Sequence, residues 1–204
     1  MPIDPLQSVE RAVEVLRLGG AIVYPTETLY GLGVDACDER ALQRLVALKG
    51  REEGKPISVL VSDGAMLHSI VAEIPAQAEI LMRRFWPGPL TLALPAKPSV
   101  SRLLTGGGGS IGVRCSSHPV ATALAAGLGR PITTPSANPA GATAPTALAQ
   151  ARAYFGDHVD VYIDGGTLAG GPGSTVVELV PELKIIREGA IPTSAVIAAL
   201  AEDH

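Results

Sequence analysis

The chain has 204 residues and a formal net charge of −4 at pH 7, with 47% hydrophobic and 18% charged residues. This composition excludes a disordered chain and predicts a single domain over residues 1–204, because the apolar content is sufficient for one substantial core. The acidic balance disfavours a surface coated with basic residues for nonspecific nucleic-acid binding, but it does not exclude a local basic cleft.

Apolar residues at helical spacing predict a first helix over residues 6–18, which Gly19 and Gly20 end, and a short strand follows at 21–24. Asp38 is placed to cap a helix over 39–48, and Gly50 ends it. The later elements are predicted in this order: a strand at 57–61, helices near 63–72 and 75–85, strands at 90–94 and 111–114, a helix near 118–128, a strand at 131–134, a helix near 145–155, strands at 159–163, 174–179 and 183–187, and a helix near 192–201.

The alternation of short β-branched runs with amphipathic segments predicts an α/β fold in which helices flank a twisted sheet. Several strands follow one another too closely for helical crossovers, so the sheet should mix parallel and antiparallel pairs. The glycine run at 106–109 is expected to form a turn or a flap.

The segment YPTETLYGLG, residues 24–33, follows a strand that reads as buried. It gathers the hydroxyls of Thr26, Thr28 and Tyr30 around Glu27, and its glycines would let the backbone approach a ligand closely. The same residues also suit a strand-to-turn connection in which the hydroxyls satisfy only the backbone.

The segment KGREEGKP, residues 49–56, places Lys49, Arg51 and Lys55 close together. Three cations at this spacing could neutralise a polyphosphate, Arg51 through its fork and the lysines as mobile charges. Basic residues at a helix C-terminus that complement the helix dipole are the alternative. No GxxxxGK[ST] motif occurs, so ATP would not bind through a P-loop.

Small polar residues at strand ends complete the candidate site. Thr134, Ser136 and Asn138 lie between prolines, which stiffen the backbone that presents them, and an ordinary proline-bracketed turn with Asx bonding is the alternative. Arg114 and Arg187 end strands and suit a carboxylate and a phosphate, and Ser174 opens another strand.

The sequence shows no arrangement for a metal or for a covalent nucleophile. Cys37 and Cys115 are the two cysteines, without a CxxC motif or metal-ligand spacing. The opening residues lack a signal-peptide pattern, and no run of 18 apolar residues occurs. These features favour a cytoplasmic protein.

In this order, YPTETLYGLG, KGR with KP, WPGPLTL, IGVR, PSAN, GSTVVEL and LKIIREG resemble the motifs of the YrdC/Sua5 family, the threonylcarbamoyl-AMP synthases, from about residue 10 to residue 190. The resemblance implies a twisted α/β fold around a large cationic cavity. It also implies synthesis of threonylcarbamoyl-AMP and pyrophosphate from L-threonine, bicarbonate and ATP, the last with Mg²⁺, for the N6-threonylcarbamoyladenosine modification of transfer RNA.

The resemblance implies roles for thirteen residues. Those matching the ATP site are Lys49, Arg51, Lys55, Ser110, Ser136, Asn138 and Arg187, with Lys49 and Arg51 as the catalytic pair. Those matching the threonine site are Thr26, Thr28, Tyr30, Arg114, Thr134 and Ser174. Many longer relatives carry His where this chain has Leu60, so the threonine pocket could be lined differently. The chain resembles the short form of the family, which works with separate transferase proteins.

Two other functions stay open on the sequence alone. A noncatalytic module could hold transfer RNA or double-stranded RNA by its phosphates in the same basic cavity. A related carbamoyl-adenylate enzyme could act on another substrate, as in hydrogenase maturation factors, although those are longer and carry regions not found here.

Overall fold

The computed structural model describes residues 5–50 and 54–202. Its α-helices are α1 (Pro5–Arg17), α2 (Glu39–Lys49), α3 (Gly64–Ile70), α4 (Ala76–Phe85), α5 (Arg102–Thr105), α6 (Pro119–Leu128), α7 (Leu148–Phe155) and α8 (Thr193–Ala201), with a 3-10 turn, η1 (Gly156–His158). Its strands are β1 (Ile22–Pro25), β2 (Tyr30–Gly33), β3 (Val59–Leu60), β4 (Leu90–Pro95), β5 (Ser110–Arg114), β6 (Ile132–Thr133), β7 (Val161–Tyr162), β8 (Thr175–Glu178) and β9 (Lys184–Arg187).

Helix α2 begins and ends where the sequence predicts. The Asp38 side chain accepts hydrogen bonds from the backbone N–H groups of Arg40 and Ala41, which satisfies two free donors of the first turn. Gly50 adopts a left-handed conformation with φ 53°, which glycine tolerates without steric cost. The local chemistry of the caps therefore fixes both ends of this helix.

The strands form two sheets of mixed direction, as predicted. One has the order β2-β1-β7, and the other has the order β6-β3-β5-β4-β8-β9. The β1–β7, β3–β5 and β4–β8 pairs are parallel, while the β1–β2, β3–β6, β4–β5 and β8–β9 pairs are antiparallel. The prediction of a mixed sheet is confirmed, and β3 at 59–60 is shorter than expected.

The sequence did not predict β2 or α5. Strand β2 lies in the segment read as a turn, and its glycines make room for the ring of Tyr24 on the neighbouring strand. A Cβ atom added at Gly33 would lie 2.9 Å from Cε1 of Tyr24, and one at Gly31 would lie 3.1 Å from its Cζ. Glycine is depleted in strands, so a strand whose glycines accommodate an aromatic ring is hard to detect from the sequence.

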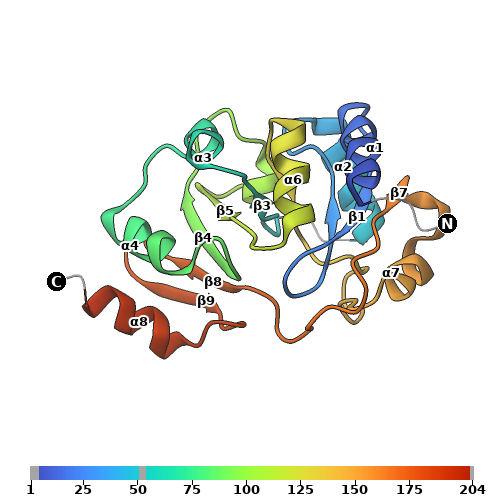
Figure 1. Cartoon of the computed structure of the whole chain (residues 1–204). Coiled ribbons are helices and arrows are strands. Elements are labelled where there is room, and N and C mark those ends of the chain that lie inside the picture. Colours follow the sequence, from blue (N-terminus) through green and yellow to red (C-terminus); the bar gives the residue numbers. More distant parts are fainter. Residues whose placement is uncertain (1–4, 51–53, 203–204) are drawn as a thin grey trace.

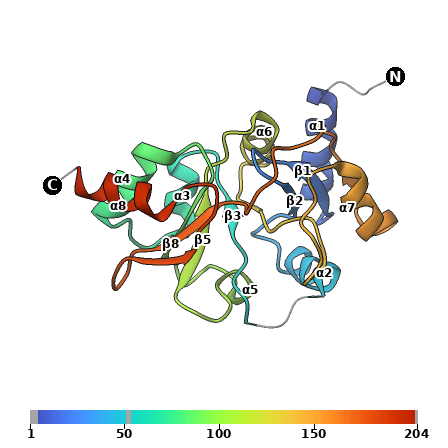
Figure 2. The same ribbon diagram turned by 90° about the horizontal axis from the view of Figure 1, so that it is seen from below.

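The chain from 131 to 137 connects the two sheets. Backbone N–H groups of Leu32 and Ala137 donate to Pro135 and Tyr30, respectively, so this segment runs beside β2. Strand β6, in the same segment, pairs with β3 of the larger sheet. Figure 2 shows the result: β1 and β2 lie on one side of β3, and β5 and β8 lie on the other.

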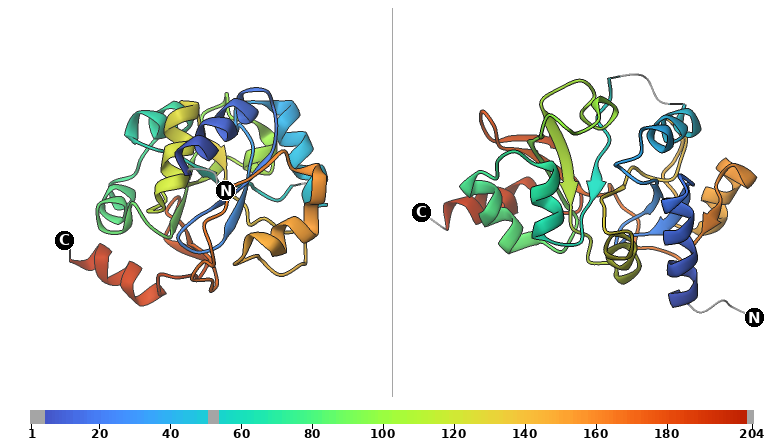
Figure 3. Two further views of the ribbon diagram at one scale, coloured as in Figure 1. Left: turned by 45° about the vertical axis from the view of Figure 1, so that its right-hand side comes forward. Right: turned by 90° about the horizontal axis from the view of Figure 1, so that it is seen from above.

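Helices cover the sheets at both ends of the molecule. Helix α1 packs against α6 beside β1, and α4 packs against α8 at the opposite end (Figure 1). The blue α1 and the red α8 therefore lie far apart (Figure 3). A contiguous cluster of buried apolar residues includes side chains from both sheets. None of the helices in the described ranges is long and apolar enough to cross a membrane.

Candidate functional site

A cavity of about 680 Å³ lies where the β1–β2 turn, the 134–136 segment and the larger sheet meet. Of the thirteen predicted site residues, ten line it: Thr26, Thr28, Tyr30, Lys49, Ser110, Arg114, Thr134, Ser136, Ser174 and Arg187. These residues come from the first, middle and last thirds of the chain. Its described lining includes three basic side chains and no carboxylate.

The β1–β2 turn places Thr26 and Thr28 in the cavity lining, but the Thr26 hydroxyl bonds mainly to the backbone of the turn itself. Thr26 Oγ1 donates to Leu29 O at 2.7 Å and accepts from the backbone N–H groups of Thr28 and Leu29. The Tyr30 hydroxyl donates to Gly166 O at 2.8 Å and accepts from Gly165 N at 2.9 Å. Tyr30 therefore contributes its ring to the cavity while its hydroxyl fixes the 164–166 loop.

Arg114, at the end of β5, is 4% exposed and pairs with Glu27 of the β1–β2 turn. Its Nη2 lies 2.8 Å from Glu27 Oε2, a charge contact whose geometry falls short of a hydrogen bond, and its Nε has no acceptor among the described residues. Burial alone would raise the pKa of Glu27, but the charge of Arg114 and the hydrogen bond from Ser116 lower it below its ordinary value. Arg114 thus lines the cavity as a buried cation that is paired with Glu27 and has guanidinium N–H groups without an acceptor in the described ranges.

Lys49, in the last turn of α2, is 6% exposed and binds the backbone of the PSAN segment. Its Nζ donates to Ser136 O at 2.6 Å and to Asn138 O at 2.7 Å, and the N–H of Ala140 donates back to Lys49 O at 2.7 Å. The end of α2 and the 136–140 segment are therefore held together by a charged side chain. This contact positions Ser136 in the cavity wall.

Arg187, on β9, closes the opposite wall. Its Nη2 donates to Ser174 O at 2.8 Å and to Ser174 Oγ at 3.2 Å, while Ser174 Oγ lies 2.8 Å from Thr91 Oγ1. Burial and the nearby charge of Arg114 lower the pKa of Arg187 from its ordinary value. Two guanidinium groups, those of Arg114 and Arg187, therefore line one cavity. Glu27 pairs with the first of them.

The hydroxyl of Thr134 is buried and has no hydrogen-bond partner among the described residues. Next to it, the Tyr24 hydroxyl donates to Thr133 O at 3.0 Å, and burial raises the pKa of Tyr24 to about 12. A buried hydroxyl without a partner in a cavity wall costs free energy, so Thr134 is a candidate to bond a ligand.

Three of the predicted residues are not placed in this lining. Arg51 lies outside the described residues. Lys55 is exposed and does not line the cavity. Asn138 is buried, and its Nδ2 donates to Pro139 O and Ala142 O, so the side chain stabilises its own turn. Leu60 is fully buried in the core and does not line the cavity either.

Sequence reasoning assigned no role to Glu27, Ser116 or Thr91. Glu27 stands between Thr26 and Thr28 in the same motif, yet nothing in the sequence pairs it with Arg114, which is far along the chain. Ser116 donates to Glu27 Oε2, and Thr91 contacts Ser174. An acidic residue inside a hydroxyl-rich turn was the available signal for Glu27.

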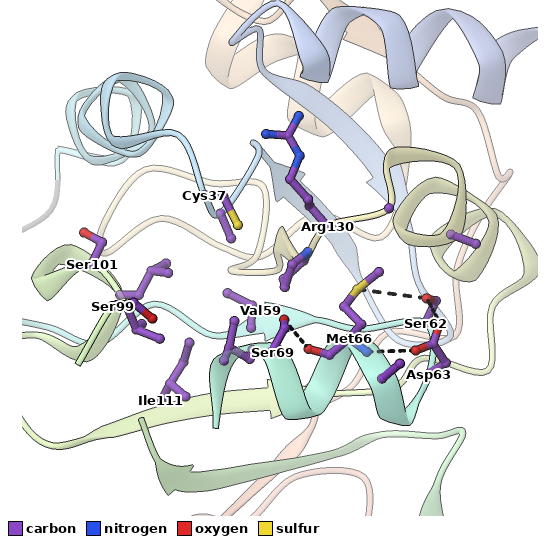
Figure 4. Close-up of a pocket in the computed structure, with 18 of the residues that line it drawn as sticks. Cys37, Val59, Ser62, Asp63, Met66, Ser69, Ser99, Ser101, Ile111 and Arg130 are labelled. Atoms are coloured by element: carbon purple, nitrogen blue, oxygen red, sulfur yellow. Dashed lines mark hydrogen bonds between the residues drawn. The ribbon is translucent and has the colours of Figure 1, made fainter. Parts of the chain in front are cut away.

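A second cavity of about 790 Å³ lies on the reverse side of β3 and β5 (Figure 4). The two cavities share these strands as a wall, because Ser58 and Gly112 face the first while Val59 and Ile111 face the second. Around the second cavity, Ser69 donates to Met66 O, Asp63 caps α3, and Arg130 Nη1 pairs with Asp35 Oδ2 at 2.9 Å. None of the twelve predicted residues that the structure describes lines it, and neither do the four buried unpartnered polar atoms found in the same ranges.

Comparison with known proteins identifies the family. Residues 14–189 match the Sua5/YciO/YrdC family model, which is described as "Telomere recombination". The chain belongs to the Sua5/YciO/YrdC family. A threonylcarbamoyl-AMP synthase of Pyrococcus abyssi is 38% identical over 193 residues, which are 94% of this chain and 56% of the relative. A threonylcarbamoyl-AMP synthase of Thiobacillus denitrificans is 40% identical over 172 residues, which are 84% of this chain and 90% of the relative.

A solved structure supports the same family assignment. The crystal structure of P. abyssi Sua5 complexed with L-threonine matches with a TM-score of 0.92 and 36% identity, over 99% of this chain and 59% of that one. The Sua5/YciO/YrdC fold that the sequence motifs imply is therefore confirmed. This chain spans little more than half of the longer Pyrococcus relative.

Proposed function

We propose that this chain is an L-threonylcarbamoyladenylate synthase, which forms threonylcarbamoyl-AMP and pyrophosphate from L-threonine, bicarbonate and ATP. The observation that carries the proposal is the convergence of ten of the thirteen predicted site residues, from distant parts of the chain, on one cavity. The names of its relatives, and the threonine bound by the Pyrococcus structure, support the same reaction. A cavity of this size, about 680 Å³, falls in the range of small-molecule sites.

The threonine end of the cavity is formed around Arg114, Thr134 and Ser174, with Thr26, Thr28 and the ring of Tyr30. A substrate carboxylate would take the donor capacity of Arg114 that Glu27 leaves unused. The unpartnered hydroxyl of Thr134 would bond a polar group of the same substrate.

The nucleotide end is formed around Arg187, Ser110, Ser136 and the end of α2 that leads to Arg51. Lys49, Arg114 and Arg187 bring three positive charges to a lining with no described carboxylate, so the cavity would attract an anion such as a triphosphate. Lys55 and Asn138 remain proposed members of the ATP site, Asn138 by shaping the turn that presents Ser136.

The chemistry would proceed in two steps. The threonine amine attacks bicarbonate to give a carbamate and water. A carbamate oxygen then attacks the α-phosphorus of ATP, which forms the phosphorus–oxygen bond and releases pyrophosphate. Because the transferred group needs no covalent attachment to the protein, the residues act by positioning the substrates and by stabilising developing charge.

Mg²⁺ would enter with ATP as part of the substrate. No group of three or more metal-ligating side chains occurs in the described ranges, and the described cavity lining contains no Asp or Glu. The donor set therefore does not fit a protein-held divalent ion, and we propose that the ion stays on the phosphate oxygens. Phosphates with few or no carboxylates are a usual mode of Mg²⁺ binding.

The product would serve the N6-threonylcarbamoyladenosine modification of transfer RNA in the cytoplasm. The carbamoyl-adenylate is a reactive intermediate, so separate transferase proteins would consume it, and transfer RNA or double-stranded RNA could contact this chain. We also propose that residues 1–204 form one domain, which the contiguous core supports.

Release of pyrophosphate from ATP, with threonine and bicarbonate omitted in turn, tests the proposal. We expect release that depends on both substrates. Release without threonine would favour a related enzyme with another substrate. Steeply salt-dependent RNA binding with no turnover under any condition would favour a noncatalytic RNA module instead.

A further inference from the structure

Glu27 joins two parts of the chain that form opposite sides of the threonine end. It projects from the β1–β2 turn, and its side chain is 16% exposed. Its Oε2 contacts Arg114 Nη2 at the end of β5 and accepts a short hydrogen bond from Ser116 Oγ, while Oε1 accepts from Ser117 N at 3.4 Å. One carboxylate thus ties the turn to the chain that follows β5.

The carboxylate determines which face of Arg114 is available. The Arg114 side chain is only 5% exposed, so its orientation is set by what surrounds it rather than by water. Glu27 lies on the Nη2 side, and no hydrogen bond among the described residues holds the rest of the guanidinium, which lines the cavity. The charge of Arg114 contributes to the lowered pKa of Arg187, so the two cations repel each other, and the Glu27 carboxylate compensates part of that repulsion.

The support of Glu27 is itself rigid. Ser116 Oγ accepts from the backbone N–H of His118, which begins helix α6, and the Thr122 hydroxyl donates to Ser116 O at 3.0 Å. Two partners of the Glu27 carboxylate, Ser116 and Arg114 at the end of β5, are therefore anchored in regular structure. A side chain held in this way can position another group to within a fraction of an ångström.

We propose that Glu27 is a positioning residue for the amino-acid substrate: it orients Arg114 so that the part of the guanidinium that is not paired with Glu27 receives the substrate carboxylate. The inference rests on the proposed function, since it assumes that Arg114 binds threonine. Glu27 itself does not touch the substrate. Its effect on threonine binding therefore has to pass entirely through Arg114.

A double-mutant cycle measures that dependence. Glu27→Gln keeps the size of the side chain but removes the compensating charge, and it places an NH₂ donor where one carboxylate oxygen faces Arg114 and Ser116 or Ser117 N. Arg114→Gln removes the guanidinium, and the double variant removes both charges together, which avoids an unpaired buried charge. Calorimetry with L-threonine, and separately with a nonhydrolysable ATP analogue, gives the two dissociation constants for each variant.

We expect Glu27→Gln to raise the threonine dissociation constant about tenfold and to leave that of the ATP analogue within about twofold of wild type. In the Arg114→Gln background, Glu27→Gln should cause no further loss of threonine binding. Asp35→Asn is the matched control, because Asp35 is also a buried carboxylate paired with an arginine, Arg130, but lies away from this cavity. It should lower the melting temperature without changing threonine binding.

Three results would overturn the inference. These are wild-type threonine affinity in Glu27→Gln, an additional loss in the Arg114→Gln background, and an equal loss in Asp35→Asn. If Glu27→Gln does not fold, Glu27→Asp replaces it, since a carboxylate that is one methylene shorter should misplace Arg114 and also weaken threonine binding. Wild-type protein that binds no threonine would refute the proposed function and this inference together, whereas wild-type binding with an unaffected Glu27→Gln would refute the inference alone.

Discussion

Replacement of Lys49 by methionine tests whether a buried ammonium holds the wall of the proposed ATP site. Methionine has a similar length and helix propensity, so the change removes mainly the charge and the donors. Lys49 Nζ donates to two carbonyls at 2.6 and 2.7 Å, and hydrogen bonds from a charged group contribute about 1.5–3 kcal/mol each. We therefore expect the free energy of unfolding to fall by about 3 kcal/mol or more.

For a chain of this length, such a loss corresponds to a melting temperature about 6 to 12 °C lower. Release of the 136–140 segment should also move Ser136 out of the cavity wall, so pyrophosphate release should be lost in protein that is still folded. Urea unfolding measures the stability, and the omission assay measures the activity.

Lys97→Met is the matched control for Lys49→Met. Lys97 Nζ also donates to a carbonyl, that of His68, at 2.6 Å, but this contact is exposed and lies outside the cavity. Its loss should change stability by less than about 0.5 kcal/mol and leave turnover intact. Equal stability of Lys49→Met and wild type would show that the lysine does not clamp this segment, and normal turnover would remove its assigned role.

Three further changes test other parts of the site. Arg114→Ala should raise the threonine KM by about 10- to 100-fold, because it removes charge-assisted hydrogen bonds to a carboxylate; an unchanged KM in folded protein would remove that assignment. Arg51→Ala should abolish pyrophosphate release, and Arg187→Ala should raise the KM for ATP more than that for threonine; near-normal kinetics would refute either role. The pKa of Glu27 is lowered in the folded state, so its contribution to stability is complete above its ordinary value of 4.5 and is lost as pH falls through the folded value. The difference in free energy of unfolding between wild type and Glu27→Gln, from urea unfolding, should therefore shrink as the pH falls below 4.5. A constant difference would contradict the pairing of Glu27 with Arg114.

The sequence predicted most of the fold because its helices and longer strands carry strong local signals. Asp38 and Gly50 fix the ends of α2 by chemistry that is readable without the structure. Strand β2 was missed because two of its four residues are glycines, which have low strand propensity. They are needed there because the ring of Tyr24 packs against them. Helix α5, a single turn, leaves too short a pattern to detect.

The candidate site was predicted mainly through the family motifs. The motifs predicted that Lys49, Arg114 and Arg187, from separate segments, line one site, and the structure places all three in one cavity. No local sequence pattern indicates that these residues meet. The division of labour among them depends on tertiary contacts: Lys49 binds a backbone segment, and Arg114 is buried against Glu27. Pairing between a turn residue and a strand end far along the chain leaves no trace in composition or periodicity.

We propose that this cavity joins threonine, bicarbonate and the adenylyl group of ATP. Incubation with carbon-13 bicarbonate, L-threonine and ATP, followed by mass spectrometry, measures that union directly. We expect a threonylcarbamoyl-AMP species that carries the labelled carbon and is lost in Arg114→Ala at low threonine concentration. An adenylate without the label, or folded protein that yields no adenylate, would refute this reaction.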